Sequence, residues 1–175
     1  MKRAKLTALC GMMTALSIVL MSITTFVPVL MYVLPIITGM VVMMVADVSN
    51  KKWGAGVYFA TSLLSLLLIT DKEAALTYTL FFGYYPLIRG SILKLPKSLS
   101  WLIRILLFNC SAVLIGLAGV YVLGLSAEEY NEFGKATVPI LLGLANAVFL
   151  MYDSIFTRWS IIFTGLSQKI SKLIR

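Results

Sequence analysis

Three polar side chains lie inside long apolar runs of this sequence, and they are its clearest candidates for specific chemistry. They are Asn109, Asn146 and Asp153. An amide or a carboxylate in such a run is costly unless it bonds to a neighbouring helix or to a ligand. Asn146 and Asp153 are seven residues apart, which places both on one face of a helix. We therefore expect Asn146 near the middle of a membrane span and Asp153 deeper toward the cytoplasm.

Asp153 needs a partner, and two arginines are expected at a comparable depth. Arg89 and Arg104 each lie in an apolar segment, so either is a candidate for an ion pair with this carboxylate. Two interpretations have equal weight: a buried ion pair that fixes helix packing, and a ligand or proton role. Arg158 is nearer the expected interface, where its long side chain can reach water.

One face of a predicted helix carries three aromatic residues and an arginine, at successive spacings of four, three and four. They are Tyr78, Phe82, Tyr85 and Arg89. Tyrosine offers a ligand both a ring face and a hydroxyl. An aromatic stripe that only packs is an equal alternative. As a binding hypothesis, we group Tyr78 and Tyr85 with Asn109 and Asn146 in one substrate pocket.

A second pattern consists of small residues near the start of the chain. Ala4, Ala8, Gly11 and Ala15 follow one another at spacings of four, three and four, which gives the first predicted helix a smooth face. Small residues let another helix approach closely in a membrane. The pattern alone favours packing within this protein, and the alternative is docking to a separate membrane subunit.

The sequence has few of the residues that most catalytic sites use. It contains no histidine and no CxxC, HExxH, Walker A or GxSxG motif. Its acids within or beside apolar segments, Asp47 and Asp153, form no obvious catalytic pair. We expect binding or transport rather than catalysis, with no cofactor and no metal site.

The elements that carry these residues are predicted from composition and run length. The 175-residue chain is 60% hydrophobic and 13% charged, and its mean hydropathy is +0.96. A chain of this composition is expected to lie in a lipid bilayer, where helices satisfy their own backbone groups. We predict an all-α integral membrane protein with one transmembrane domain over 1–175, a bundle of about six transmembrane helices. Their approximate ranges are 6–26, 29–46, 53–70, 74–93, 99–123 and 137–166.

Two of these spans contain residues that disturb a helix. Pro28 and Pro35 predict a bend or an irregular entry to the second span. Gly83 and Pro86 predict that the fourth span is loosened or kinked and that a backbone carbonyl loses its helical partner.

The charges predict the orientation of the chain. The net charge is +8, and most of the basic residues lie at the ends of the spans, with no basic stripe among stacking aromatics that would suggest nucleic acid. Terminal segments and loops on one side hold ten lysines or arginines, and those on the other side hold two. This asymmetry predicts that both termini are cytoplasmic. The one substantial outer loop, 124–136, is acidic, and we favour a solvated cap over a lid.

The small-residue face near the N-terminus and the six predicted spans resemble the substrate-binding S component of an energy-coupling factor (ECF) transporter, over essentially the whole chain. The resemblance implies that Ala4, Ala8, Gly11 and Ala15 dock onto a membrane coupling subunit, which works with two separate ATPase subunits. It also implies a pocket on the extracellular half of a bacterial cytoplasmic membrane protein.

The cargo that the resemblance implies is a vitamin, a vitamin precursor or a metal ion. The chain lacks the N-terminal Met-His start of the nickel and cobalt branch, so we favour an organic micronutrient. The alternative function is structural, because the rod-shape scaffold subunit of the cell-wall elongation machinery has a similar size and number of spans. A membrane enzyme would need a second acid or nucleophile facing Asp153.

Overall fold

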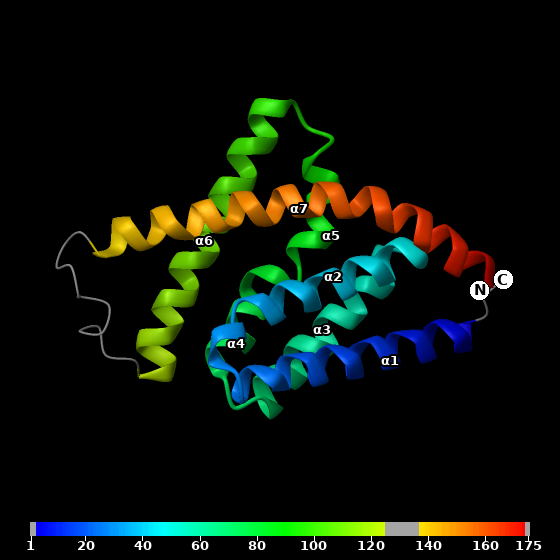
Figure 1. Ribbon diagram of the computed structural model, residues 1–175, viewed down its shortest axis with the longest axis horizontal. Helices are drawn as coiled ribbons and strands as arrows, with labels where there is room; N and C mark the ends of the chain where they lie inside the picture. The colour runs from blue at the N-terminus through cyan, green and yellow to red at the C-terminus, as the bar shows by residue number, and fades with distance from the viewer. Residues whose placement is uncertain (1–2, 125–136, 174–175) are drawn as a thin grey trace. The chain divides into compact units, whose positions relative to one another are not determined.

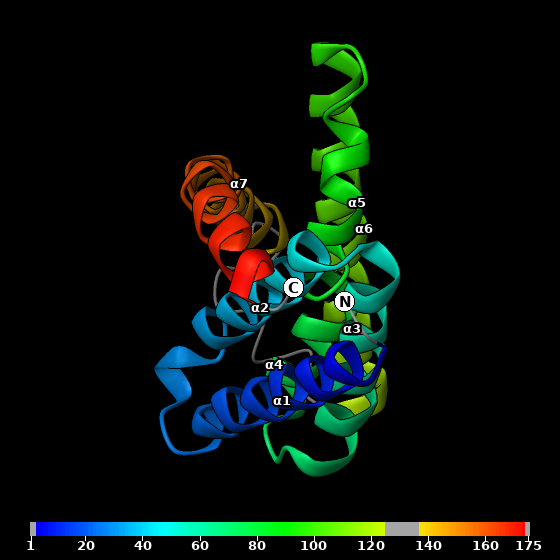
Figure 2. The same cartoon turned by 90° about the vertical axis from the view of Figure 1, so that its right-hand side faces the viewer.

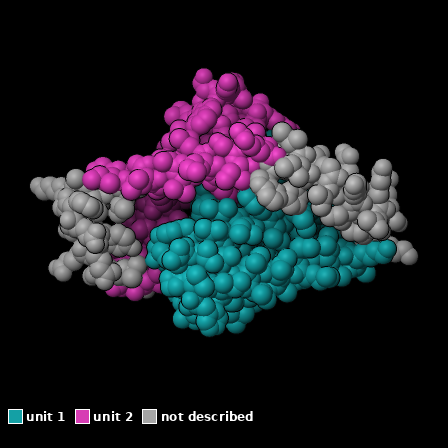
Figure 3. Space-filling view, viewed as in Figure 1, with its two compact units in different colours: residues 1–91, 162–175 teal, residues 92–161 magenta. Residues whose placement is uncertain are grey.

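The computed structural model describes residues 3–124 and 137–173, and all the regular structure in these ranges is helical. The chain divides into two compact units (Figure 3). Unit 1 comprises residues 1–91 and 162–175, and unit 2 comprises residues 92–161. The predicted all-α fold is confirmed. The predicted acidic cap, residues 125–136 of the outer loop, lies outside the described residues.

Three long helices form the body of unit 1. They are α1 (Arg3–Ser22), α2 (Val33–Val48) and α3 (Lys51–Leu68), and each packs against the other two (Figures 1 and 2). The side chains at the centre of this packing are buried and mostly apolar, namely Met21, Val42, Val45, Val57, Ile69 and Tyr78.

The chain between α1 and α2 is irregular, as the two prolines predict. Two short 3₁₀ turns fill it, η1 (Ile23–Thr25) and η2 (Pro28–Leu30). Pro28 begins the second turn and Pro35 lies in the first turn of α2, two positions where the missing N–H group is tolerated. The proline pair therefore produces an irregular entry and leaves the interior of α2 regular.

Side-chain caps fix the next two helix starts. The Asn50 side chain accepts hydrogen bonds from the backbone N–H groups of Lys52 and Trp53, at 3.0 and 3.2 Å. The Asp71 carboxylate accepts one from the N–H of Ala74 at 3.0 Å. Each cap satisfies backbone donors that have no acceptor within their own helix.

The helix predicted over 74–93 is not continuous. The structure has α4 (Lys72–Thr77), a π-helical turn η3 (Tyr78–Phe82) and α5 (Tyr85–Ile92) in its place. The Gly83 N–H reaches back five residues to the Tyr78 carbonyl, at 2.8 Å, so the Thr79 carbonyl loses its normal α-helical donor. Three residues later, Pro86 has no N–H to offer the Phe82 carbonyl. The predicted loosening and the freed carbonyl are both present.

Two glycines allow this interrupted segment to pack closely. A Cβ atom at Gly39 in α2 would overlap the backbone carbonyl of Phe82. A Cβ atom at Gly83 would overlap the rings of Tyr58 and Tyr78. A larger residue at Gly39 would have to push α2 away from the π turn, and one at Gly83 would have to displace these two rings.

Unit 2 contains α6 (Lys97–Leu123) and the first part of α7 (Thr137–Leu173). Gly124 ends α6 in the left-handed conformation, with φ of 69°, which glycine adopts at little cost. The rings of Phe108 and Phe149 stack between the two helices, with centroids 4.6 Å apart and planes at 11°.

Within the described ranges, two helices are long and apolar enough to cross a membrane: Arg3–Thr25 and Lys97–Tyr121. The helix Val33–Val48 is apolar but shorter. Large apolar side chains are also widely exposed, including Phe26 at 84% and Val29 at 86%. An apolar solvent or a partner would cover such surface at lower cost than water.

Candidate functional site

The tyrosines predicted to line a pocket lie in the core of unit 1. Tyr78, in η3, and Tyr85, at the start of α5, are each 0% exposed. Tyr85 stacks on Phe81 with ring centroids 4.9 Å apart, and Tyr78 lies 6.2 Å from the ring of Tyr58. Phe82 and Arg89, the other members of the predicted face, are also buried. The whole face is therefore interior, and aromatic packing accounts for much of it.

Unit 1 also buries several hydroxyl groups that have no hydrogen-bond partner in the described structure. The side-chain oxygens of Ser17, Thr77 and Thr79 are among them. Thr61 lies beside the Tyr78 hydroxyl, and Ser62 lies beside the Tyr58 hydroxyl, but neither contact has hydrogen-bond geometry. The side-chain oxygens of Thr61, Ser62 and Tyr78 therefore also have no hydrogen-bond partner among the described residues. Buried hydroxyls are normally satisfied. We give the name hydroxyl cluster to the five of these residues that lie on α3 and on the α4–η3 segment packed against it, namely Thr61, Ser62, Thr77, Tyr78 and Thr79. Their hydroxyls can hydrogen-bond water or a polar ligand.

The α3 residues of this region were not predicted from the sequence. One face of this otherwise apolar helix carries a stripe of four polar residues, at successive spacings of three, one and three. They are Tyr58, Thr61, Ser62 and Ser65. This spacing is the signal that would have identified them. All except Tyr58 are buried.

The predicted asparagines form a reciprocal pair in unit 2. Asn109 in α6 and Asn146 in α7 exchange two side-chain hydrogen bonds, at 3.0 and 2.9 Å. Each amide nitrogen also donates to the carbonyl four residues earlier in its own helix, Ile105 or Leu142, at 2.8 Å. A ligand that used these amides would have to replace bonds that are already made. The tyrosines of the predicted pocket belong to unit 1 and the asparagines to unit 2.

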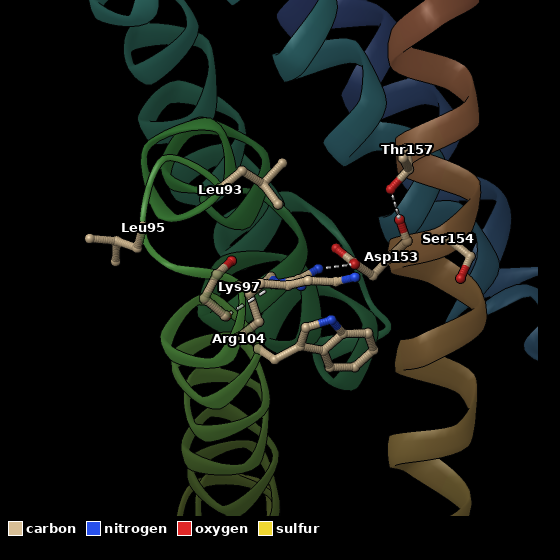
Figure 4. Close-up of a pocket in the computed structure, with 9 residues that line it drawn as sticks. Leu93, Leu95, Lys97, Arg104, Asp153, Ser154 and Thr157 are labelled. Carbon is tan, nitrogen blue, oxygen red and sulfur yellow. Dashed lines mark hydrogen bonds and ion pairs between the residues drawn. The ribbon is translucent and has the colours of Figure 1, made fainter.

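Arg104 is an ion-pair partner of Asp153 within unit 2. Both side chains are buried, and the guanidinium and the carboxylate are in direct contact (Figure 4). Two further contacts hold the arginine: its Nε donates to the Ser100 carbonyl at 3.2 Å, and its guanidinium lies 4.8 Å from the centre of the Trp101 ring. Arg89 is buried in unit 1, and Arg158 is exposed. The pair fits the packing interpretation of Asp153.

The small-residue face of α1 is exposed along its length. Ala4, Ala8, Gly11 and Ala15 are all exposed, and a Cβ atom at Gly11 would meet nothing within 4 Å. The opposite side of α1 buries Thr14, Ser17 and Met21. The helix therefore packs on α2 and α3 through another face and leaves its small residues exposed.

No group of three or more His, Cys, Asp or Glu side chains lies together in the described parts of the chain. In comparisons with known proteins, no protein-family model matches this sequence, and no significant match appears among curated proteins or solved structures.

Proposed function

We propose that this chain is a membrane protein whose helices span the bacterial cytoplasmic membrane with both termini in the cytoplasm. Two helices have the required length and apolarity, and exposed apolar side chains such as Phe26 and Val29 suit contact with lipid. The bias of lysine and arginine toward one set of loops supports this orientation.

In that membrane, the chain acts as the substrate-binding subunit of an ECF-type importer. The observation that carries this proposal is the exposed small-residue face of α1. Packing within the protein was the favoured explanation of this pattern, but α1 buries a different face. An exposed row of Ala4, Ala8, Gly11 and Ala15 suits close approach by a helix of a coupling subunit, which two separate ATPase subunits drive.

The cargo is a small organic micronutrient, bound on the extracellular half of the protein. The hydroxyl cluster and the Tyr58 and Tyr78 rings support this assignment, because together they offer hydrogen-bonding groups and flat apolar surfaces. Tyr85, in unit 1, and the pair Asn109 and Asn146, in unit 2, are further candidate ligand contacts, each within its own unit. A ligand that reached the asparagines would exchange their mutual hydrogen bonds for its own.

The docking proposal is tested by co-purification with the coupling subunit and ATPases of the same cell. Gly11→Leu and Ala15→Leu place bulky side chains on the exposed face and are expected to abolish the complex. Gly116→Leu and Ala147→Leu are matched controls at exposed positions of α6 and α7, and they should leave it intact. Association of the wild type that survives both α1 substitutions would overturn the docking face.

A structural role is the second candidate, and the full burial of Tyr78 and Tyr85 favours it. A scaffold resembling the rod-shape subunit of the elongation machinery would have a well-packed interior and would bind no cargo. Mass spectrometry of small molecules released from gently purified protein separates the two functions. A stoichiometric organic molecule supports the importer. Release of none, together with a stable complex with a cell-wall synthesis enzyme, supports the scaffold.

A further inference from the structure

Unit 2 contains a cleft of about 360 Å³ at the start of α6 (Figure 4). One wall is the first two turns of α6, which contribute Lys97, Ser100, Trp101 and Arg104. The facing wall is α7 around Asp153. The Arg104–Asp153 ion pair lies between these two walls and accounts for their packing, but not for the open space beside it.

The charges that line the cleft do not cancel. Asp153 is paired with Arg104, which Trp101 and the Ser100 carbonyl also hold in place. Lys97 is exposed, and no carboxylate of the described residues pairs with it. The cleft therefore presents one uncompensated positive charge beside a fixed ion pair, which favours an anionic ligand.

The hydroxyl group of Ser100 is a second, independent indication of a ligand in the cleft. It is 3% exposed, and its hydroxyl has no hydrogen-bond partner in the described structure. Burying a hydroxyl without a partner costs free energy, which a ligand oxygen in the cleft would recover. Ser100 lies three residues after Lys97 and four before Arg104, so all three share one face of α6.

The backbone at the start of α6 also favours an anion. Pro96 precedes the helix and provides no side-chain cap. The Ser100 N–H is bonded to the Pro96 carbonyl at 2.9 Å, but the three N–H groups before it have no acceptor within the helix. Those donors and the positive end of the helix dipole make an uncapped helix start a site for phosphate or carboxylate groups.

We propose that this cleft binds a phosphate group, with Lys97, the Ser100 hydroxyl and the first turn of α6 as its donors. Leu93 and Leu95 also line the cleft and are exposed, so apolar surface adjoins the cationic site. This combination suits the headgroup of an anionic phospholipid, whose phosphate and acyl chains would meet the two surfaces. A free phosphate would use only the polar half. The inference does not depend on the import role.

The test uses the full chain, purified in detergent and stripped of lipid, with native mass spectrometry and calorimetry as readouts. The probes are phosphatidylglycerol, phosphatidylcholine and inorganic phosphate. We expect phosphatidylglycerol to bind and Lys97→Gln to weaken it about tenfold or more. Lys94→Gln is the matched control, because it removes the same charge three residues away and does not line the cleft. It should change the affinity by less than about twofold.

Ser100→Ala gives a second readout that a purely structural role would not produce. Without ligand it removes an unsatisfied buried hydroxyl, so the melting temperature should stay the same or rise. With phosphatidylglycerol the affinity should fall. Ser98→Ala, on the same turn outside the cleft lining, should change neither quantity.

The outcomes separate the sources of the phosphate. If inorganic phosphate binds and is lost in Lys97→Gln while phosphatidylglycerol does not bind, the cleft is a phosphate site for a soluble ligand. Equal binding of the two lipids, with Lys97→Gln and Lys94→Gln indistinguishable, would overturn the proposal. So would failure of all three probes to bind the folded wild type.

Discussion

The Tyr58 hydroxyl in α3 donates a 2.9 Å hydrogen bond to the Thr79 carbonyl in η3. That carbonyl is the one that the π-helical turn deprives of its backbone donor, because the Gly83 N–H bonds to Tyr78 instead. A side chain of the neighbouring helix thus replaces the missing backbone hydrogen bond. The interruption of the fourth predicted helix and the polar stripe of α3 are parts of one arrangement.

Tyr58→Phe should destabilise the protein by about 1–3 kcal/mol, because it leaves the half-buried Thr79 carbonyl without a donor. The measurement is the free energy of unfolding in mixed detergent micelles. Tyr121→Phe is the control, since Tyr121 is 82% exposed, and it should fall within about 0.5 kcal/mol of the wild type. Equal effects of the two substitutions would mean that the hydrogen bond contributes nothing.

Gly39→Ala should also destabilise, by about 1–3 kcal/mol, because its methyl group would overlap the backbone carbonyl of Phe82. A backbone atom cannot move aside as a flexible side chain can. Gly56→Ala in α3 has open space around the new methyl group, so its higher helix propensity should leave stability unchanged or increased. The comparison is made by thermal unfolding of the two variants in one detergent. A stable Gly39→Ala protein would contradict the close approach of α2 to the π turn.

The sequence was informative about the elements of unit 1 and less so about their contacts. Pro28, Pro35, Gly83 and Pro86 act on their own backbone, so their effects follow from residue type alone. The donor that satisfies the freed Thr79 carbonyl is Tyr58, a residue of another helix, and the pattern of the fourth predicted helix alone does not identify it. Single-sequence periodicity contains no information about which helix is adjacent.

The Asn109 and Asn146 amides should show direct energetic coupling. Alanine at either position removes both mutual hydrogen bonds, so the double variant should lose less stability than the sum of the two single variants, by about 1 kcal/mol. A double-mutant cycle of unfolding free energies measures this difference. The control cycle combines Asn109→Ala with Ser154→Ala, an exposed residue of α7, and should give no coupling. Additivity in the first cycle would contradict the pair.

Asp153→Asn should destabilise by about 3–5 kcal/mol, because it leaves the buried Arg104 charge without its carboxylate. Replacing both residues with apolar ones, Arg104→Met with Asp153→Leu, should cost less than the single change. Arg158→Gln, at an exposed position, serves as the control for loss of an arginine. The readout is again the unfolding free energy. If Asp153→Asn unfolds like the wild type while ligand binding falls, the carboxylate has a ligand role and the packing interpretation is wrong.

In unit 2, the residue types predicted that the buried polar groups need partners, and geometry was required to identify them. Arg89 and Arg104 were equal candidates in the sequence because both lie at a similar expected depth. Lys97 and Ser100 looked like ordinary residues of a helix start, since neither is unusual in type or spacing. Only the burial of the Ser100 hydroxyl and the cleft beside it distinguish them.

The length of α7 has a consequence for a protein that lies in a bilayer. At 1.5 Å per residue, its 37 residues make a rod of about 56 Å, whereas a hydrocarbon layer is about 30 Å thick. The tilt of a transmembrane helix, up to about 40° from the membrane normal, does not bring a rod of this length within the hydrocarbon layer. If the helix starts at the outer interface, its last turns, which carry Lys169 and Lys172, extend past the inner headgroups. In the proposed orientation, the protein then has a basic helical extension on its cytoplasmic side, within reach of soluble partners that never enter the lipid.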